Sequence, residues 1–180
     1  LGRYEEADHW CELAIRASRE MDFHEGMAIA LTCRASLLSD LGEHTRAVTT
    51  AREAHVAMPH LSDPRIEADC LIGLGGVEAA AEQTDLAMRS FGQALLISEE
   101  IHYWQGAARA QAESAAAYVR LGLYEEALAA GRRARRVLHR CGMRLVTAQT
   151  LASEADCALA AGHIAAALAP LTGRISQVPS

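Results

Sequence analysis

The chain repeats a short pattern every forty residues. Leu-Gly-x-Tyr-Glu-Glu-Ala occurs at 1–7 and again at 121–127, three periods later. Glycine recurs at the same place, with Glu82 in the one exceptional period: Gly2, Gly42, Gly122 and Gly162. Alanine follows five residues later in every period: Ala7, Ala47, Ala87, Ala127 and Ala167. A fixed period of about 20–50 residues is typical of stacked repeats, in which each unit packs on its neighbours.

Apolar residues at helical spacing flank the repeated glycines, as Met27, Leu31 and Leu38 do before Gly42. Because glycine turns the chain at little steric cost, each period predicts two antiparallel helices. First helices are expected near 23–41, 64–81, 103–121 and 143–161, and second helices near 44–57, 84–101, 124–140 and 163–174. A further, unpaired second helix is expected at about 3–20, which makes about nine helices in an all-α solenoid.

These helices are expected to form one array over residues 1–180. It consists of a partial repeat at 1–21 and repeats at 22–61, 62–101, 102–141 and 142–180. Since the chain begins within a repeat, at Leu1 and not at a methionine, we expect a fragment of a longer protein.

Several residues predict how individual helices begin and end. Asp63-Pro64 is a helix start, because proline is tolerated in the first turn. Thr84 or Asp85 is expected to cap the helix that follows the turn without glycine. Pro170 falls within the last second helix and predicts an early stop, a kink or a restart. A second alanine also recurs every forty residues, and Arg174 takes its place in the last period: Ala14, Ala54, Ala94 and Ala134.

Composition narrows the class of protein. Half of the chain is apolar, only 4% is aromatic, and alanine carries much of the apolar count, which suits closely packed helices. No apolar run approaches the roughly 18 residues that span a membrane. Five cysteines without a close pair favour reduced thiols in the cytoplasm. The net charge of −6 opposes general nucleic-acid affinity. All 17 basic residues are arginine and asparagine is absent, which favours a GC-rich bacterial source.

The repeated residues resemble the tetratricopeptide repeat (TPR). The resemblance rests on Leu121–Ala127 with Ala134, on Leu74-Gly75 with Ala87, Phe91 and Ala94, and on Gly42, Ala47, Ala54 and Pro59. It covers nearly the whole chain, with a longer first helix absorbing the residues beyond the usual period of about 34. It implies an α-α superhelix of the long-period type found in large bacterial transcription regulators and signalling ATPases, where such arrays act as sensor or protein-interaction modules.

The resemblance also implies that first helices line a concave groove. The candidate groove residues are Ile29, Thr32, Ser36, Asp69, Ile72, Arg109, Glu113, Arg120, Gln149 and Asp156. Small side chains with charges around them would accept a peptide or a helix. The alternative is that these are ordinary exposed positions. Binding of a C-terminal carboxylate, as some members of the family do with lysine and asparagine, is not expected because both are absent.

A cluster of arginines is the second candidate surface. It comprises Arg132, Arg133, Arg136, Arg140 and Arg144, together with Arg135. Arg132, Arg136 and Arg140 recur at i,i+4 on one helix face without an acid four residues before them. This stripe would suit phosphate or an acidic partner. The alternatives are a solvated outer face or pairing with acids of a neighbouring helix, and no recognition-helix motif supports sequence-specific DNA binding.

Other suggestive residues have simpler interpretations. Ile72–Gly76 contains three glycines but lies within a predicted helix, so close helix packing is expected and not a nucleotide loop. His9 with Cys11, and His139 with Cys141, are too few donors for a metal site. We interpret Tyr4 and Tyr124 as packing residues, and Trp10 and Trp104 as core residues or partner anchors.

The sequence therefore predicts a non-catalytic scaffold without cofactor or metal, which binds a protein or peptide, including other domains of the same polypeptide. A small-molecule or signal-peptide sensor that holds its ligand in the groove is the alternative function. A homodimer joined through the repeat ends is a further alternative, because a truncated array exposes apolar end faces.

Overall fold

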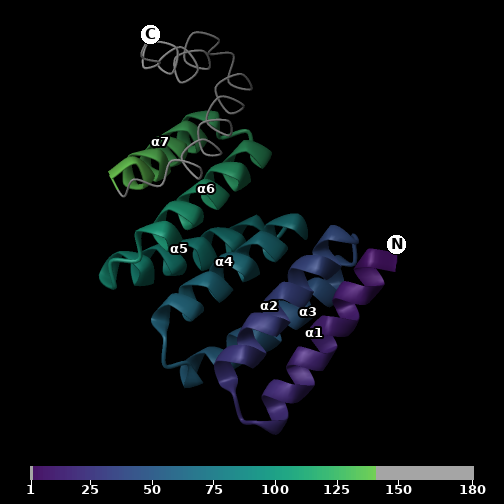
Figure 1. Ribbon diagram of the computed structural model, residues 1–180. Helices are drawn as coiled ribbons and strands as arrows, with labels where there is room; N and C mark the ends of the chain where they lie inside the picture. The colour runs from purple at the N-terminus through teal and green to yellow at the C-terminus, as the bar shows by residue number, and fades with distance from the viewer. Residues whose placement is uncertain (1, 141–180) are drawn as a thin grey trace, which may run out of the picture. The chain divides into compact units, whose positions relative to one another are not determined.

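A computed structural model describes residues 2–140, which form a succession of antiparallel helices (Figure 1). The helices are α1 (Gly2–Glu20), α2 (His24–Asp40), α3 (His44–Ala57), α4 (Pro64–Ala80), α5 (Thr84–Glu100), α6 (Trp104–Arg120) and α7 (Tyr124–Arg140). No strand occurs within residues 2–140. The first and last residues of these seven helices agree with the predicted ones to within one residue, which confirms the predicted positions. The helices predicted at 143–161 and 163–174, with Pro170 and Arg174, lie outside the described residues.

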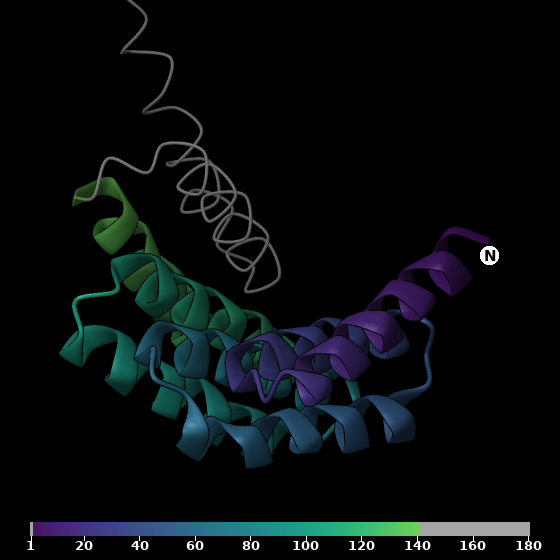
Figure 2. The ribbon, with the colours of Figure 1, turned by 60° about the horizontal axis from the view of Figure 1, so that its bottom comes forward.

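The chain divides into two compact units, Leu1–Gly106 and Ala107–Ser180. In the first unit, α2 packs against α1, α3 and α4, and α4 packs in turn against α3 and α5. Figures 1 and 2 both show α1 lying along α2 at the edge of this unit. In the second unit, α7 packs its apolar face on the part of α6 that belongs to that unit.

Five of the turns between helices have the same backbone conformation. One residue in each has a positive φ: Asp22 (52°), Gly42 (79°), Glu82 (61°), His102 (57°) and Gly122 (72°). The next N–H donates to the carbonyl five residues earlier, for example from Glu43 to Leu38 at 2.9 Å and from Gln83 to Glu78 at 2.8 Å. This is the Schellman motif that ends many helices. The backbone therefore repeats every twenty residues, half the sequence period.

The connection between α3 and α4 is different. A 3₁₀ turn, Met58–His60, follows α3, and Leu61 is extended. Asp63 then caps α4, its side chain accepting from the N–H of Arg65 at 2.9 Å, with Pro64 in the first turn as predicted. The prediction that Thr84 or Asp85 caps α5 is wrong. Gln83 occupies the cap position without a side-chain hydrogen bond, because the Schellman motif sets where α5 begins.

The repeated alanines form the centre of each hairpin. Ala47, Ala87 and Ala127 are each 0% exposed, so these positions have room for only a small side chain. In the first unit one core cluster consists of Ala35, Leu38, Ala47, Val48, Ala51, Leu74 and Val77. A larger residue at such a site would force the helices apart, at a cost of about 1–3 kcal/mol. None of the described helices is long and apolar enough to cross a bilayer.

Gly26 and Gly106 lie at the start of first helices, each beneath an aromatic ring. A Cβ added at Gly26 would lie 2.5 Å from the Phe23 ring, and one at Gly106 would lie 2.5 Å from the Tyr103 ring. Both would also meet a serine hydroxyl of the preceding helix at 2.7 Å. Close approach of these side chains accounts for both glycines.

Candidate binding surfaces

The predicted groove residues of α2 and α4 divide between surface and core. Ile29 is 47% exposed and Ser36 is exposed. Thr32 is half-buried in the contact between α2 and α4, where its methyl group lies over Gly73. Ile72 is only 4% exposed, so its placement among exposed groove residues is wrong. α4 has helices α2, α3 and α5 around it, and they bury more of its surface than the repeat register indicates.

The glycines near Ile72 lie inside α4 and serve packing. A Cβ on Gly75 would lie 2.6 Å from the ring of Phe91, and one on Gly73 would clash with Thr32. Close helix packing is thus confirmed at these two positions. Gly76 differs, since nothing lies within 4 Å of an added Cβ.

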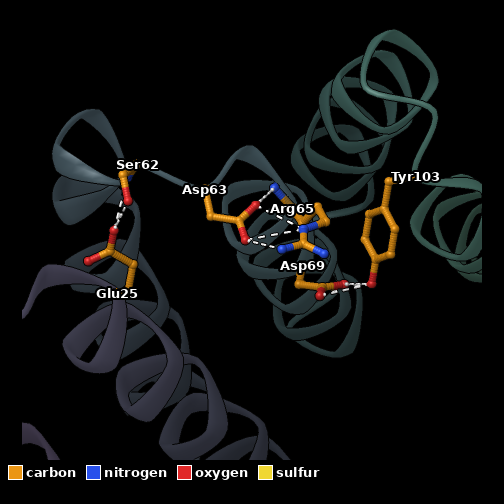
Figure 3. Close-up of polar contacts among 6 residues, drawn as sticks. All are labelled: Glu25, Ser62, Asp63, Arg65, Asp69 and Tyr103. Atoms are coloured by element: carbon orange, nitrogen blue, oxygen red, sulfur yellow. Dashed lines mark hydrogen bonds and ion pairs between the residues drawn. The ribbon is translucent and has the colours of Figure 1, made fainter.

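Asp69 is positioned by a hydrogen bond from the turn before α6. The hydroxyl of Tyr103 donates to its two carboxylate oxygens at 3.2 and 3.4 Å (Figure 3). Asp69 is half-buried on α4, one turn after Arg65. The carboxylate is therefore held in one place on the predicted groove face of the first unit.

Further polar contacts tie the beginnings of α2 and α4 together (Figure 3). Glu25 accepts from the hydroxyl of Ser62 at 2.5 Å and from its N–H at 3.0 Å, and these hydrogen bonds lower the pKa of the Glu25 carboxyl. The guanidinium of Arg65 donates to Asp63 at 2.7 Å, which lowers the pKa of Asp63 and raises that of Arg65. These contacts fix the irregular α3–α4 connection against the first helices.

The remaining described groove candidates belong to the second unit. Arg109, Glu113 and Arg120 are all exposed on α6, with Arg109 and Glu113 one turn apart. Gln149 and Asp156 lie outside the described residues. The structure therefore places two sets of candidates on first helices, one in each unit.

The predicted arginine stripe lies on the outer face of α7. Arg132, Arg133 and Arg136 are exposed, whereas Arg135 is half-buried. The opposite face carries Ala127, Leu128, Ala134 and Leu138, which are at most 2% exposed. Arg140 is the last residue of α7, and Arg144 lies outside the described residues. This arrangement suits a solvated face, pairing with acids of a neighbouring helix, or an acidic partner.

The structure contains an apolar hollow between α1 and α2 that the sequence did not predict. Its volume is about 490 Å³, and Trp10, Met21, Phe23, Ile29 and Cys33 are among the residues that line it. Trp10 is 62% exposed and Met21 is 68% exposed. Core packing of Trp10 is therefore wrong. One feature of the sequence could have indicated this hollow, namely the unpaired second helix expected at 3–20. It predicts an exposed apolar end, but it does not show which residues form that end.

An ion-pair cluster joins the two helices beside this hollow. Arg34 of α2 donates to Asp8 at 2.7 Å and to Glu12 at 2.6 Å, both on α1. The pKa of Arg34 is raised, chiefly by its hydrogen bond to Asp8. Because Arg34 is mostly buried and contacts two carboxylates, it fixes α1 against α2.

Trp104 and Tyr4 are also at the surface. Trp104 is 41% exposed and stacks on His102 with 5.2 Å between ring centroids. Core packing of Trp104 is therefore wrong as well. Tyr4 is 43% exposed, whereas Tyr124 is half-buried. Residues 2–140 contain no group of three or more histidine, cysteine or acidic side chains placed to hold a metal ion.

Comparison with known proteins shows the fold. No family model and no curated protein sequence matches the chain. Among solved structures, BtubC from P. vanneervenii is 15% identical, with a TM-score of 0.64 over 98% of this chain and 94% of that one. A Rap protein in complex with competence and sporulation factor is 18% identical, with a TM-score of 0.68 over 97% of this chain. The chain spans 58% of that Rap protein. Together with the helical hairpins, these likenesses show a TPR-like helical-repeat fold.

Proposed function

We propose that this chain is a non-catalytic repeat module that binds a protein or peptide through the exposed face of its first helices. The observation that carries this proposal is the preformed surface on α2 and α4. Ile29 and Ser36 are exposed there, and Asp69 is held by Tyr103. The backbone beneath is fixed by buried alanines, so a partner would dock without the cost of ordering this face.

The likeness to the Rap protein supports this proposal. That structure is a complex with competence and sporulation factor, and the chain matches it over 97% of its own length. A protein that shares this fold thus forms a complex with competence and sporulation factor. In this chain, side chains on the same kind of stack would determine which partner is bound.

We further propose that the module acts in the bacterial cytoplasm as the regulatory region of a larger transcription regulator. The long repeat period and the resemblance to regulator arrays support this. The complete open reading frame tests it. A nucleotide-binding loop and a helix-turn-helix in the same polypeptide would support the proposal, and a short gene that encodes repeats alone would refute it.

Affinity purification with matched variants tests the binding surface. Ser36→Arg places a large cation on the exposed face of α2, and Val56→Glu, at a residue 74% exposed on α3, is the control. We expect a protein recovered with the parent chain and with Val56→Glu to be lost from Ser36→Arg. Loss from an Arg132→Glu/Arg136→Glu variant alone would move binding to α7 and refute the first-helix surface. A retained small molecule without a protein partner, seen by native mass spectrometry, would favour the sensor alternative.

A further inference from the structure

One glycine of α4 serves no packing role within the described part of the chain. At Gly73 and Gly75, an added Cβ would clash with a neighbouring side chain. At Gly76, nothing among residues 2–140 lies within 4 Å of an added Cβ. Alanine would therefore fit there, and it would favour the helix because glycine loses more backbone freedom on folding. Gly76 thus lowers the stability of α4, and the contacts of the described residues do not account for it.

Gly76 lies on the first-helix surface proposed above. Ser36 precedes it by forty residues, at the same register on α2, and is exposed. Asp69 precedes it by seven residues, which places both on one face of α4, two turns apart. α2 and α4 pack against each other, and each also packs against two further helices of the first unit. Ser36, Asp69 and Gly76 therefore belong to one surface of two inner helices.

Gly92 of α5 provides a comparison within the same unit. It also has open space around an added Cβ, but it is exposed, whereas Gly76 is half-buried. A side chain at Gly92 would extend into solvent. A side chain at Gly76 would stand on the surface formed with Ser36 and Asp69 and would keep a bound molecule away from α4. Glycine is the residue that lets the main chain of another molecule approach closely.

An extended segment makes better use of this position than a helix does. The main chain of a helix is covered by side chains on every side, so a helix would contact Gly76 mainly through a side chain. In an extended segment, successive side chains point to opposite faces, and the main chain is open along its edges. The open space over Gly76 therefore favours an extended peptide.

The charge of the first unit indicates the sign of this peptide. The first unit contains 18 acidic and 8 basic side chains, a net charge of −10 at pH 7, whereas the second contains 5 acidic and 9 basic ones, a net charge of +4. Figure 3 shows the carboxylates of Glu25, Asp63 and Asp69 near the beginnings of α2 and α4. The guanidinium of Arg65, drawn with them, is bonded to Asp63. Such a field attracts a cationic peptide and repels an acidic one.

We propose that the first-helix surface of the first unit binds an extended cationic peptide, with its main chain against Gly76 and a lysine or arginine side chain beside Asp69. This inference rests on the function proposed above and names the chemistry of the partner. Tyr103 holds the Asp69 carboxylate in place, and a carboxylate has about four acceptor positions, so it can accept from a further donor. The two turns between Asp69 and Gly76 correspond to roughly 10 Å, which about three extended residues span.

Selection from a peptide library tests the sign of the charge. The probe is a phage-displayed library of random peptides of about twelve residues, or roughly 40 Å when extended, and the 180-residue chain is the bait. We expect the selected peptides to be enriched at least threefold in arginine and lysine over aspartate and glutamate, relative to the unselected library. The most enriched peptide should bind at least threefold more weakly in about 1 M than in about 0.1 M NaCl, because the Debye length falls from about 10 Å to about 3 Å.

Two matched pairs of variants locate the bound peptide. Gly76→Ala and Gly92→Ala each add a Cβ to open space in a helix, so both should raise the free energy of unfolding. Only Gly76→Ala should weaken binding of the selected peptide, by at least tenfold. Asp69→Asn keeps an acceptor for Tyr103 and should also weaken binding at least tenfold. Asp85→Asn, at an exposed residue of α5, removes the same charge elsewhere in the unit and should leave the affinity unchanged.

The outcomes separate this inference from the function on which it rests. Selected peptides that are neutral or acidic, no enrichment of any peptide, or equal binding to Gly76→Ala and Gly92→Ala would each overturn the inference. A peptide that binds Ser36→Arg as tightly as the parent chain would refute the first-helix surface itself. Loss of binding in Ser36→Arg, with unchanged binding to Gly76→Ala and Asp69→Asn, would overturn the inference alone and leave the proposed function standing.

Discussion

Replacing Glu82 with glycine is expected to stabilise the protein. Glu82 has φ +61° in the turn between α4 and α5, the same left-handed conformation as Gly42 and Gly122. It is exposed, so its side chain contributes little packing to the core. The Gln83 N–H to Glu78 carbonyl bond at 2.8 Å fixes this conformation whichever residue occupies the position. The substitution therefore removes strain and leaves the turn unchanged.

The magnitude follows from two opposing effects. A residue with a Cβ in the left-handed region costs roughly 1–2 kcal/mol, which Glu82→Gly removes. Glycine loses more backbone freedom on folding, at a cost of about 0.5–1 kcal/mol. The expected net gain in the free energy of unfolding is thus about 0.5–1 kcal/mol. For a chain of 180 residues this corresponds to a rise in Tm of about 1–4 °C.

Urea unfolding followed by circular dichroism at 222 nm measures this gain. Glu82→Ala is the matched control, because it removes the carboxylate from the end of α4 but keeps a Cβ at the strained φ. We expect Glu82→Ala to gain less than half as much as Glu82→Gly. Equal gains for both variants would show that charge matters and strain does not. A loss of stability in Glu82→Gly would refute the argument outright.

Four other outcomes are expected. Gly75→Ala should lower the free energy of unfolding by about 1–3 kcal/mol, because its Cβ would meet the buried ring of Phe91; Gly76→Ala, with open space around it, should raise it by about 0.5–1 kcal/mol. Both are measured by urea unfolding. Asp63→Ala should lower the Tm, since loss of a helix cap costs about 0.5–2 kcal/mol. The hydrogen bonds from Ser62 lower the pKa of Glu25 in the folded chain. They therefore stabilise the fold at pH values above the unfolded pKa of about 4.3, and this stabilisation is lost as the pH falls through the folded pKa. Glu25→Gln should therefore flatten the fall in Tm as the pH drops below about 4.3, and an unchanged slope would contradict this.

The positions of the helices could be predicted because the repeat supplies the same signal several times. Alanines at Ala47, Ala87 and Ala127 mark the same packed site, and each is 0% exposed. Glycines at Gly42 and Gly122 mark two of the turns. The predicted positions of the helices therefore remain correct in the period in which Glu82 replaces glycine. Redundancy among repeats, more than any single motif, determined the helix bounds.

The remaining features depend on three-dimensional neighbours that the register does not contain. Asp22 and His102 adopt positive φ although neither is glycine, because the backbone hydrogen bonds of the Schellman motif offset the strain. Ile72 is buried because α2, α3 and α5 surround α4, whereas Trp10 lies at the surface of α1, which packs against α2. Side-chain position within a period predicts which face a residue is on, but not what covers that face.

The repeated alanine of the second helices shows what a neighbouring helix contributes to local stability. Ala54, Ala94 and Ala134 are at most 1% exposed, and each is buried by a neighbouring helix. Ala14 is the same residue at the same register and is exposed, so the stabilisation available there is not realised within residues 2–140. Amide hydrogen exchange around Ala14 in α1 should therefore be faster than exchange around the covered Ala54 in α3, and equal rates at the two positions would contradict this.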